Sequence, residues 1–176
     1  MTKKVVTGKV RGSYVNVFRP RVNDMNGKEE YSMAILIPKE DKETIAKINA
    51  AVGEAVKEKF GGKKPANLRH PLRDGDDERP DDENYAGAFF MNIKSQNKPG
   101  IIDKQRQEVL DVDEFVSGDY CRVSMNAYAY DVNGNRGVAF GLGNIQVLAK
   151  GEPLSGRARA TDEFGSWDDD DEDDFG

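Results

Sequence analysis

The most constraining feature of this sequence is the regular alternation of side chains over residues 119–131. The odd positions are apolar or small, namely Cys121, Val123, Met125, Ala127 and Ala129. The even positions are polar or aromatic, namely Tyr120, Arg122, Ser124, Asn126, Tyr128 and Tyr130. Because successive side chains of a strand point to opposite faces, the pattern predicts a strand with one face in a core and the other outward.

Several other stretches carry strand signals at intervals marked by turn residues. They cover residues 5–18, 31–37, 86–94 and 137–148, with weaker signals at 100–103 and 108–110. Asn26-Gly27 separates the first two stretches, and Asn133-Gly134 separates 119–131 from 137–148. Asn-Gly favours type I′ turns, which need positive φ at both central positions, so both pairs predict β-hairpins.

One segment has helical periodicity. Residues 40–60 place apolar side chains at helical spacing, at Ile45, Ile48, Val52, Ala55 and Val56. Asp41 is a candidate N-cap, and Gly61-Gly62 ends the helix. The polar connection 63–84 that follows is long for a compact domain, so we expect it to be either mobile or a functional flap.

These elements predict a mostly β fold with one main helix, over residues 1–150. Short strands at turn-marked intervals are typical of a small barrel, and we expect a modified OB-fold, a five-stranded β-barrel with extra hairpins. The helix follows the second strand, whereas in the simplest OB arrangement it lies between the third and fourth. An open α+β sheet with the helix on one face is the alternative.

The charge is divided unevenly along the chain. The net charge is −6, yet residues 162–176 hold nine acidic residues and no basic one. Removing those nine from the 32 acidic residues leaves 23 against 26 Lys and Arg, so residues 1–161 carry about +3. From residue 151 onward apolar side chains are few, which predicts a disordered acidic tail over 151–176.

The outward faces of three predicted strands combine aromatic rings with amides and cations. Nucleic-acid bases stack on exposed rings while Lys and Arg bind phosphates, and this mixture suits sequence-tolerant binding of single strands. The candidate DNA-binding residues are Tyr14, Phe18, Arg19, Phe90, Lys94, Lys98, Arg122, Tyr128, Tyr130 and Phe140. Outward aromatics equally often cover a second core, and Phe140 is ambiguous because both faces of its strand are apolar.

The tail ends in an acidic run with an aromatic residue one position from the terminus. Such a run stays extended, and its ring can enter a pocket of a partner while the carboxylates meet surrounding cations. Trp167, Asp173, Asp174 and Phe175 are the candidate partner-binding residues. A tail that serves only solubility is the alternative, but it has no use for the two aromatic rings.

No pattern for catalysis or metal binding emerges. His70 is the only histidine and lies far from Cys121 in sequence, and the acidic cluster 74–83 lacks the spacing of a calcium loop. We therefore predict no catalytic residues, no metal site and no cofactor. The single cysteine excludes an intrachain disulfide, and without a secretory signal or an apolar run of roughly 18 residues we expect a soluble protein away from membranes.

Several motifs resemble a known family. They are YAGAFFMNIK at 85–94, KPGIID at 98–103, SGDYCRV at 117–123, YAY at 128–130 and NRGVAFGLGNIQ at 135–146. Over residues 10–155 the chain resembles a family of tailed-bacteriophage single-stranded DNA-binding proteins, long known only as a domain of unknown function. The resemblance implies an OB-fold, binding of single strands without strong sequence preference, and a role in phage replication or recombination inside the cytoplasm of an infected bacterium.

The tail is similar to those by which proteins of this function recruit replication enzymes such as a polymerase or a helicase. One departure is that Gly176 follows Phe175, so a partner that grips a terminal Phe carboxylate would bind less well. The leading hypothesis is strand protection with the tail as a recruitment arm. A protein-binding adaptor or DNA mimic and a strand-annealing mediator are the alternatives, and the sequence leaves weak self-association open.

Overall fold

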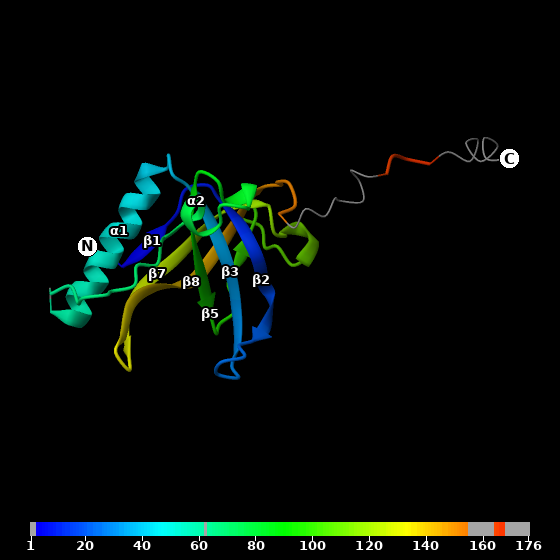
Figure 1. Ribbon diagram of the computed structural model, residues 1–176. Helices are drawn as coiled ribbons and strands as arrows, with labels where there is room; N and C mark the ends of the chain where they lie inside the picture. The colour runs from blue at the N-terminus through cyan, green and yellow to red at the C-terminus, as the bar shows by residue number, and fades with distance from the viewer. Residues whose placement is uncertain (1–2, 62, 155–163, 168–176) are drawn as a thin grey trace.

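The computed structural model describes residues 3–61, 63–154 and 164–167 (Figure 1). The strands are β1 (Lys4–Val6), β2 (Val10–Val22), β3 (Glu29–Pro38), β4 (Arg73–Asp74), β5 (Ala88–Ser95), β6 (Ile101–Ile102), β7 (Tyr120–Val132) and β8 (Asn135–Ala149). The helices are α1 (Lys42–Phe60) and the single turn α2 (Gly75–Glu78), with 3₁₀ turns at Glu83–Tyr85 and Val112–Glu114. None of these helices is long and apolar enough to span a membrane.

Five strands close into a barrel. β2 pairs with β3, β3 with β5, β5 with β8, β8 with β7, and β7 returns to β2. Only the β5–β8 contact in this circuit is parallel. The short strands β1, β4 and β6 add to β7, β5 and β8 respectively. The predicted OB-like, mostly β fold with one main helix is therefore confirmed, and the open-sheet alternative is wrong because the pairing circuit closes.

The two Asn-Gly pairs form different turns. Asn133 and Gly134 both have positive φ, 52° and 85°, and they alone separate β7 from β8, as the type I′ prediction requires. At the other hairpin only Gly27 has positive φ, and Asn23 and Lys28 close a wider loop through an Asn23 N–Lys28 O hydrogen bond of 2.8 Å. The hairpin was predicted correctly there, but its turn type was wrong.

Two further predictions need correction. The stretch 5–18 is not one strand, because the chain leaves β1 at Gly8, where the Gly8 N–H donates to Thr44 Oγ1 at 2.9 Å, and pairing resumes in β2. The weak signal at 108–110 yields a single bridge between Ile102 and Glu108. The connection 63–84, expected to be either mobile or a functional flap, holds β4, α2 and the start of a 3₁₀ turn.

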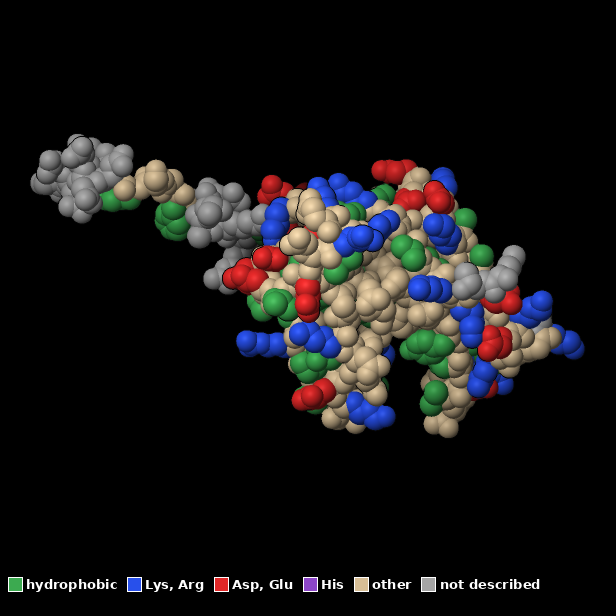
Figure 2. Space-filling model, turned by 180° about the vertical axis from the view of Figure 1, so that it is seen from behind, with side chains coloured by type: hydrophobic (Ala, Val, Ile, Leu, Met, Phe, Trp, Pro, Cys, Tyr) green, Lys and Arg blue, Asp and Glu red, His purple; other side chains and the backbone are tan. Residues whose placement is uncertain are grey.

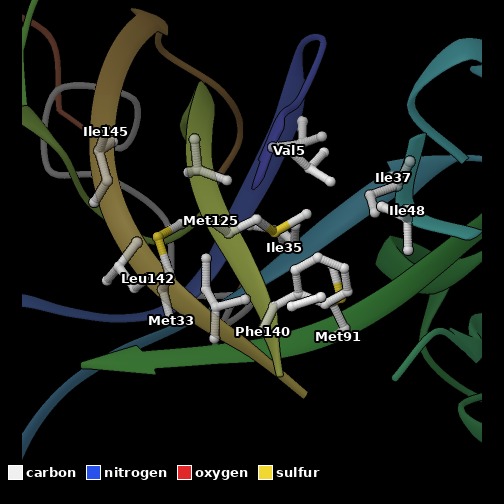
Figure 3. Close-up of a cluster of buried hydrophobic side chains, with 14 of the residues drawn as sticks. Val5, Met33, Ile35, Ile37, Ile48, Met91, Met125, Phe140, Leu142 and Ile145 are labelled. Atoms are coloured by element: carbon white, nitrogen blue, oxygen red, sulfur yellow. The ribbon is translucent and has the colours of Figure 1, made fainter. Parts of the chain in front are cut away.

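Helix α1 packs against the barrel core. Asp41 accepts a hydrogen bond from the Thr44 N–H at 3.2 Å, and Gly61 ends the helix in a left-handed conformation, as predicted. Ile48 is fully buried from the helix side, and Figure 3 shows it beside Ile37 of β3. Most of the remaining core comes from the inner faces of the strands, including Val5, Met33, Ile35, Met91, Met125, Phe140, Leu142 and Ile145.

A second, smaller core lies outside the barrel. Residues 73–87, here called the strap, cross the outer face of β3 and β5 and bury Tyr85 with Leu36, Ala88 and Phe90. Lys39 holds the strap through ion pairs of 2.8 Å to each of Asp74 and Asp76, which raise the pKa of Lys39 to about 12. The predicted outward face of β5 is thus partly covered.

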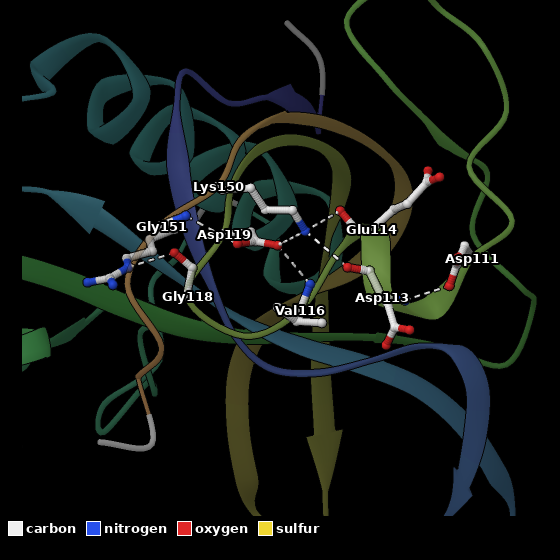
Figure 4. A network of polar contacts seen from close by, with 9 residues as sticks. Asp111, Asp113, Glu114, Val116, Gly118, Asp119, Lys150 and Gly151 are labelled. Atoms are coloured by element: carbon white, nitrogen blue, oxygen red, sulfur yellow. Dashed lines mark hydrogen bonds and ion pairs between the residues drawn. The ribbon is translucent and has the colours of Figure 1, made fainter. Parts of the chain in front are cut away.

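The chain leaves the barrel through a polar network (Figure 4). Asp119 is fully buried, and its carboxylate accepts hydrogen bonds from the Val116 N–H, the Gly151 N–H and Lys150 Nζ. Lys150 Nζ also donates to the carbonyls of Asp113 and Glu114. Beyond this network Leu154 still packs against the second core, so the chain follows the barrel wall before the acidic region begins.

Candidate nucleic-acid interface

One polar row crosses the outer face of the barrel. Strand register places Asn16 opposite Ser32, Ser32 opposite Lys94, Lys94 opposite Gly141, and Gly141 opposite Asn126. Paired residues in a sheet project from the same face, and Lys94 and Asn126 are exposed. The row offers amides, a hydroxyl and a cation, with no large apolar side chain, and takes one residue from each of β2, β3, β5, β8 and β7.

Two tyrosines continue this face along β7. Tyr128 lies opposite Ala139, and Tyr130 opposite Gly137, so the facing strand β8 presents only small residues. The ring of Tyr128 is 43% exposed. The phenol end of Tyr130 lies over Gly137, where an added Cβ would be only 2.5 Å from Tyr130 Oη. β8 therefore forms a floor that is partly open at Ala139 and Gly141, between Lys94 and Tyr128, and covered at Gly137 by Tyr130.

Two arms extend beyond the barrel on the same side (Figure 1). The first arm is the far half of the β2–β3 hairpin, with its loop at residues 23–28, and the second arm is the far half of the β7–β8 hairpin. Figure 2 shows a notch between these two projections. Arg19 and Arg21 are exposed on the first arm and Tyr128 on the second, so each arm carries side chains of a kind suited to nucleic acid.

The predicted cations occupy separate parts of the surface. Lys94 lies at the row, 3.7 Å from Glu30, whose pKa is lowered by a hydrogen bond from Asn23 and by the charge of Lys94. Arg122 donates to Gln146 Oε1 at 2.6 Å, and Gln146 is about 16 Å along β8 from Gly141 at 3.3 Å per residue. Arg122 thus lies apart from the tyrosines, and Lys98 is exposed in the β5–β6 connection.

The expectation that Phe90 presents an open face is wrong. Its side chain points outward from the barrel as the alternation predicted, but it is only 2% exposed. Tyr85 meets it edge-on with ring centroids 5.1 Å apart, and Arg73 and Arg79 lie over it at 5.2 Å and 5.7 Å. The strap occupies the position where a base would stack.

The same expectation is wrong for Phe140. It pairs with Ala127 and with Ile93, both on the inner faces of their strands, and it is 1% exposed in the main core.

Phe18 is half-buried against that core. Tyr14 is 60% exposed, but it lies at a bulge with φ of 48°, beside Tyr85 of the strap.

The partner-binding residues of the tail are only partly described. Trp167 is 59% exposed. Asp173, Asp174 and Phe175 lie outside the described residues, so their role stays a prediction.

The groups considered for catalysis do not meet. The His70 ring bonds Asn49 Oδ1 at 3.1 Å, and burial, assisted by the nearby charge of Lys64, lowers its pKa. Burial raises the pKa of the Cys121 thiol to about 12, which keeps it protonated. Within the described ranges no three His, Cys, Asp or Glu side chains gather closely enough to hold a metal ion.

Sequence reasoning missed the residues that keep the face open. Gly137, Ala139 and Gly141 lie on the outer side of β8. Their lack of bulk leaves Ala139 and Gly141 partly accessible, whereas Gly137 is buried beneath Tyr130 and Arg69. Their alternation with Val138, Phe140 and Leu142 was the available signal, because it places small residues on one face and core residues on the other. Asn126 was recognised as outward but was not selected as a site residue.

Comparison with known proteins identifies relatives of this architecture. Residues 3–175 match the family described as Enterobacter phage Enc34, ssDNA-binding protein. The chain belongs to this family. A protein designated p50, from Acyrthosiphon pisum secondary endosymbiont phage 1, is 28% identical in an alignment of 163 positions that covers 87% of each chain.

Solved structures of two phage proteins share the fold. The single-stranded DNA-binding protein from bacteriophage Enc34, in complex with ssDNA, superposes with a TM-score of 0.77 at 21% identity, over 86% of this chain and 89% of that one. The gp2.5 single-stranded DNA-binding protein of bacteriophage T7 gives a TM-score of 0.61 at 14% identity, over 89% and 97% of the two chains. At these identities the likeness concerns the fold.

Proposed function

We propose that this protein binds single-stranded DNA along its outer face, without strong preference for base sequence. One observation supports the proposal most directly: the partly open β8 floor at Ala139 and Gly141 lies between the exposed Tyr128 and Lys94. Rings of this kind stack on any base, while cations attract phosphates. The Enc34 member of the family, whose fold this chain shares, was solved with ssDNA.

The biological role we propose is protection of single strands during phage DNA replication or recombination, in the cytoplasm of an infected bacterial host. Binding requires no chemical step, and we infer that the protein is not an enzyme. Lys94, Tyr128 and Tyr130 are the central contacts, with Arg19 on the facing arm. Lys98 and Arg122 would contact a strand only where it continues along β8.

We further propose that residues 1–150 form the DNA-binding domain and residues 151–176 a recruitment tail. The tail would bind a replication protein such as a polymerase or helicase through Trp167, Asp173, Asp174 and Phe175. The nine acidic residues at 162–176 and the exposed Trp167 support this role. Pull-down with purified phage and host replication proteins, comparing the full chain with the Phe175→Ala variant, tests it, and equal capture by both would contradict a role for the terminal ring.

The core proposal is tested by fluorescence anisotropy with labelled oligo-dT and a duplex of equal length. We expect tighter binding to the single strand, falling steeply as salt rises from about 50 to 300 mM. Equal affinity for duplex, or an affinity insensitive to salt, would contradict it. Absence of binding, even after the acidic residues at 168–174 are replaced by amides, would favour a protein-binding adaptor or DNA mimic.

A further inference from the structure

A short piece of the chain between α1 and β4 pairs with β8 in the second arm. The Arg69 N–H donates to the Arg136 carbonyl at 3.0 Å, and the Val138 N–H donates to the Arg69 carbonyl at 3.1 Å. These bonds pair Arg69 with Gly137 in parallel orientation. They use the same edge of β8 that pairs with β5 at Gly141. The sheet beside the β8 floor is thus extended along the arm.

The backbone at Arg69 is held from its other side as well. Leu68 is half-buried against the main core. His70 Nδ1 accepts a hydrogen bond from the Leu72 N–H at 3.1 Å, so its Nε2 carries the proton and donates to Asn49 Oδ1 of α1. The lowered pKa of His70 agrees with this neutral form. The backbone at Arg69 is therefore held in place by contacts to α1 on one side and to β8 on the other.

The side chains of Arg69 and Tyr130 share the outer face. A Cβ added to Gly137 would lie 2.5 Å from Tyr130 Oη and 3.0 Å from Arg69 Cβ, so both side chains pack over this buried glycine and lie side by side. Arg69 is exposed. Within the described part of the chain no carboxylate comes within ion-pair distance of it, whereas Arg136 pairs with Asp131 and Arg73 with Glu78.

We propose that Arg69 is a phosphate-binding residue of the DNA path, and that the path continues from Lys94 along the β8 floor into the second arm. This inference rests on the proposed function and extends it to a residue outside the barrel strands. A base stacked on the exposed part of Tyr130 would bring its phosphate toward Arg69. Gly141 and Gly137 are about 13 Å apart along β8, so Lys94 and Arg69 can serve successive parts of one strand.

The test is the salt dependence of oligo-dT binding by full-length Arg69→Ala, with Lys42→Ala as matched control. Each phosphate contact on a single strand contributes about 0.7 to the slope of log K against log salt. We expect Arg69→Ala to lower that slope by about 0.7, equally for dT, dC and dA oligomers, and Arg69→Lys to restore it. Lys42 is exposed at the far end of α1 and should leave the slope unchanged.

Folding of the variants is checked by urea denaturation, because the Arg69 backbone bonds do not depend on its side chain. If the wild-type protein binds and Arg69→Ala keeps its slope, the inference is overturned while the proposed function stands. If Arg69→Lys fails to restore the slope, a phosphate contact by the cation is likewise excluded. Failure of the wild-type protein to bind would overturn both.

Discussion

The outer faces of β7 and β5 follow the same sequence alternation but meet different surroundings. Tyr128 on β7 is 43% exposed above the small residues of β8. Phe90 on β5 also points away from the barrel, yet it is 2% exposed because the strap lies over it. Alternation separates the inside of a barrel from its outside, but it carries no information about what a distant segment packs onto the outside.

The strap gives Phe90 the environment of a core residue. Tyr85 and Phe90 meet at an interplanar angle of 89°, a favourable edge-to-face geometry, and Arg79 lies over both rings at 5.2 Å and 5.7 Å. Among the residues that the structure describes, none covers Tyr128 of β7 in this way, and Tyr128 is 43% exposed. One aromatic residue thus contributes mainly to stability, and the other is available for binding.

Truncation of Phe90 should have the largest effect. Replacing a buried Phe with Ala removes its transfer free energy and leaves a cavity, so Phe90→Ala should lower the free energy of unfolding by about 3–5 kcal/mol. Urea denaturation followed by circular dichroism measures this. Tyr128→Ala in the same assay should change stability by about 0.5 kcal/mol or less. Equal losses for the two variants would remove the distinction between the two faces.

Truncation of Tyr128 should instead weaken DNA binding. Loss of one stacking ring costs about 1–3 kcal/mol, so Tyr128→Ala should bind oligo-dT roughly 5- to 150-fold more weakly. Tyr128→Phe retains the ring and should bind within about twofold of the wild type. Anisotropy titrations at constant salt provide the comparison. A weak Tyr128→Phe variant would indicate that the hydroxyl, rather than the ring face, makes the contact.

Loosening the strap should produce a smaller change. Arg79→Ala removes the cation over Tyr85 and Phe90, and a cation–π contact at an exposed site contributes about 0.5–1 kcal/mol. Urea denaturation should show a loss of this size, with faster amide exchange confined to residues 73–87. Arg21→Ala, an exposed arginine of the first arm, is the control. Unchanged exchange in the strap would show that its other contacts suffice.

The inner face of β7 should be inert to thiol reagents. Burial raises the pKa of Cys121 to about 12, whereas an unfolded cysteine titrates near 8.5. A thiol-reactive dye at pH 8 should label the urea-unfolded chain and leave the native protein unlabelled. Because the folded pKa is the higher one, this group's contribution to stability is complete below about pH 8.5 and is lost as pH rises toward 12. Rapid native labelling would contradict burial of this face.

Local patterns in the sequence accounted for the elements whose geometry depends on neighbouring residues. The alternation at 119–131 defined the inner and outer sides of β7, Asn133-Gly134 specified its turn, and Asp41 marked the start of α1. Each depends on a period, a positive φ or a cap, which act over a few residues. That the Tyr128 side chain points away from the barrel core could therefore be predicted from the sequence.

Contacts between residues far apart in the sequence determined the features that local patterns could not predict. Closure of the barrel depends on two parallel pairs between β5 and β8, and the cover over Phe90 comes from a segment with no apolar period of its own. The position of Arg69 depends on pairing with a residue 68 positions away. Such contacts form only when many individually weak packing and hydrogen-bonding interactions are made at once. Their register is therefore a property of the assembled fold and cannot be derived from neighbouring residues.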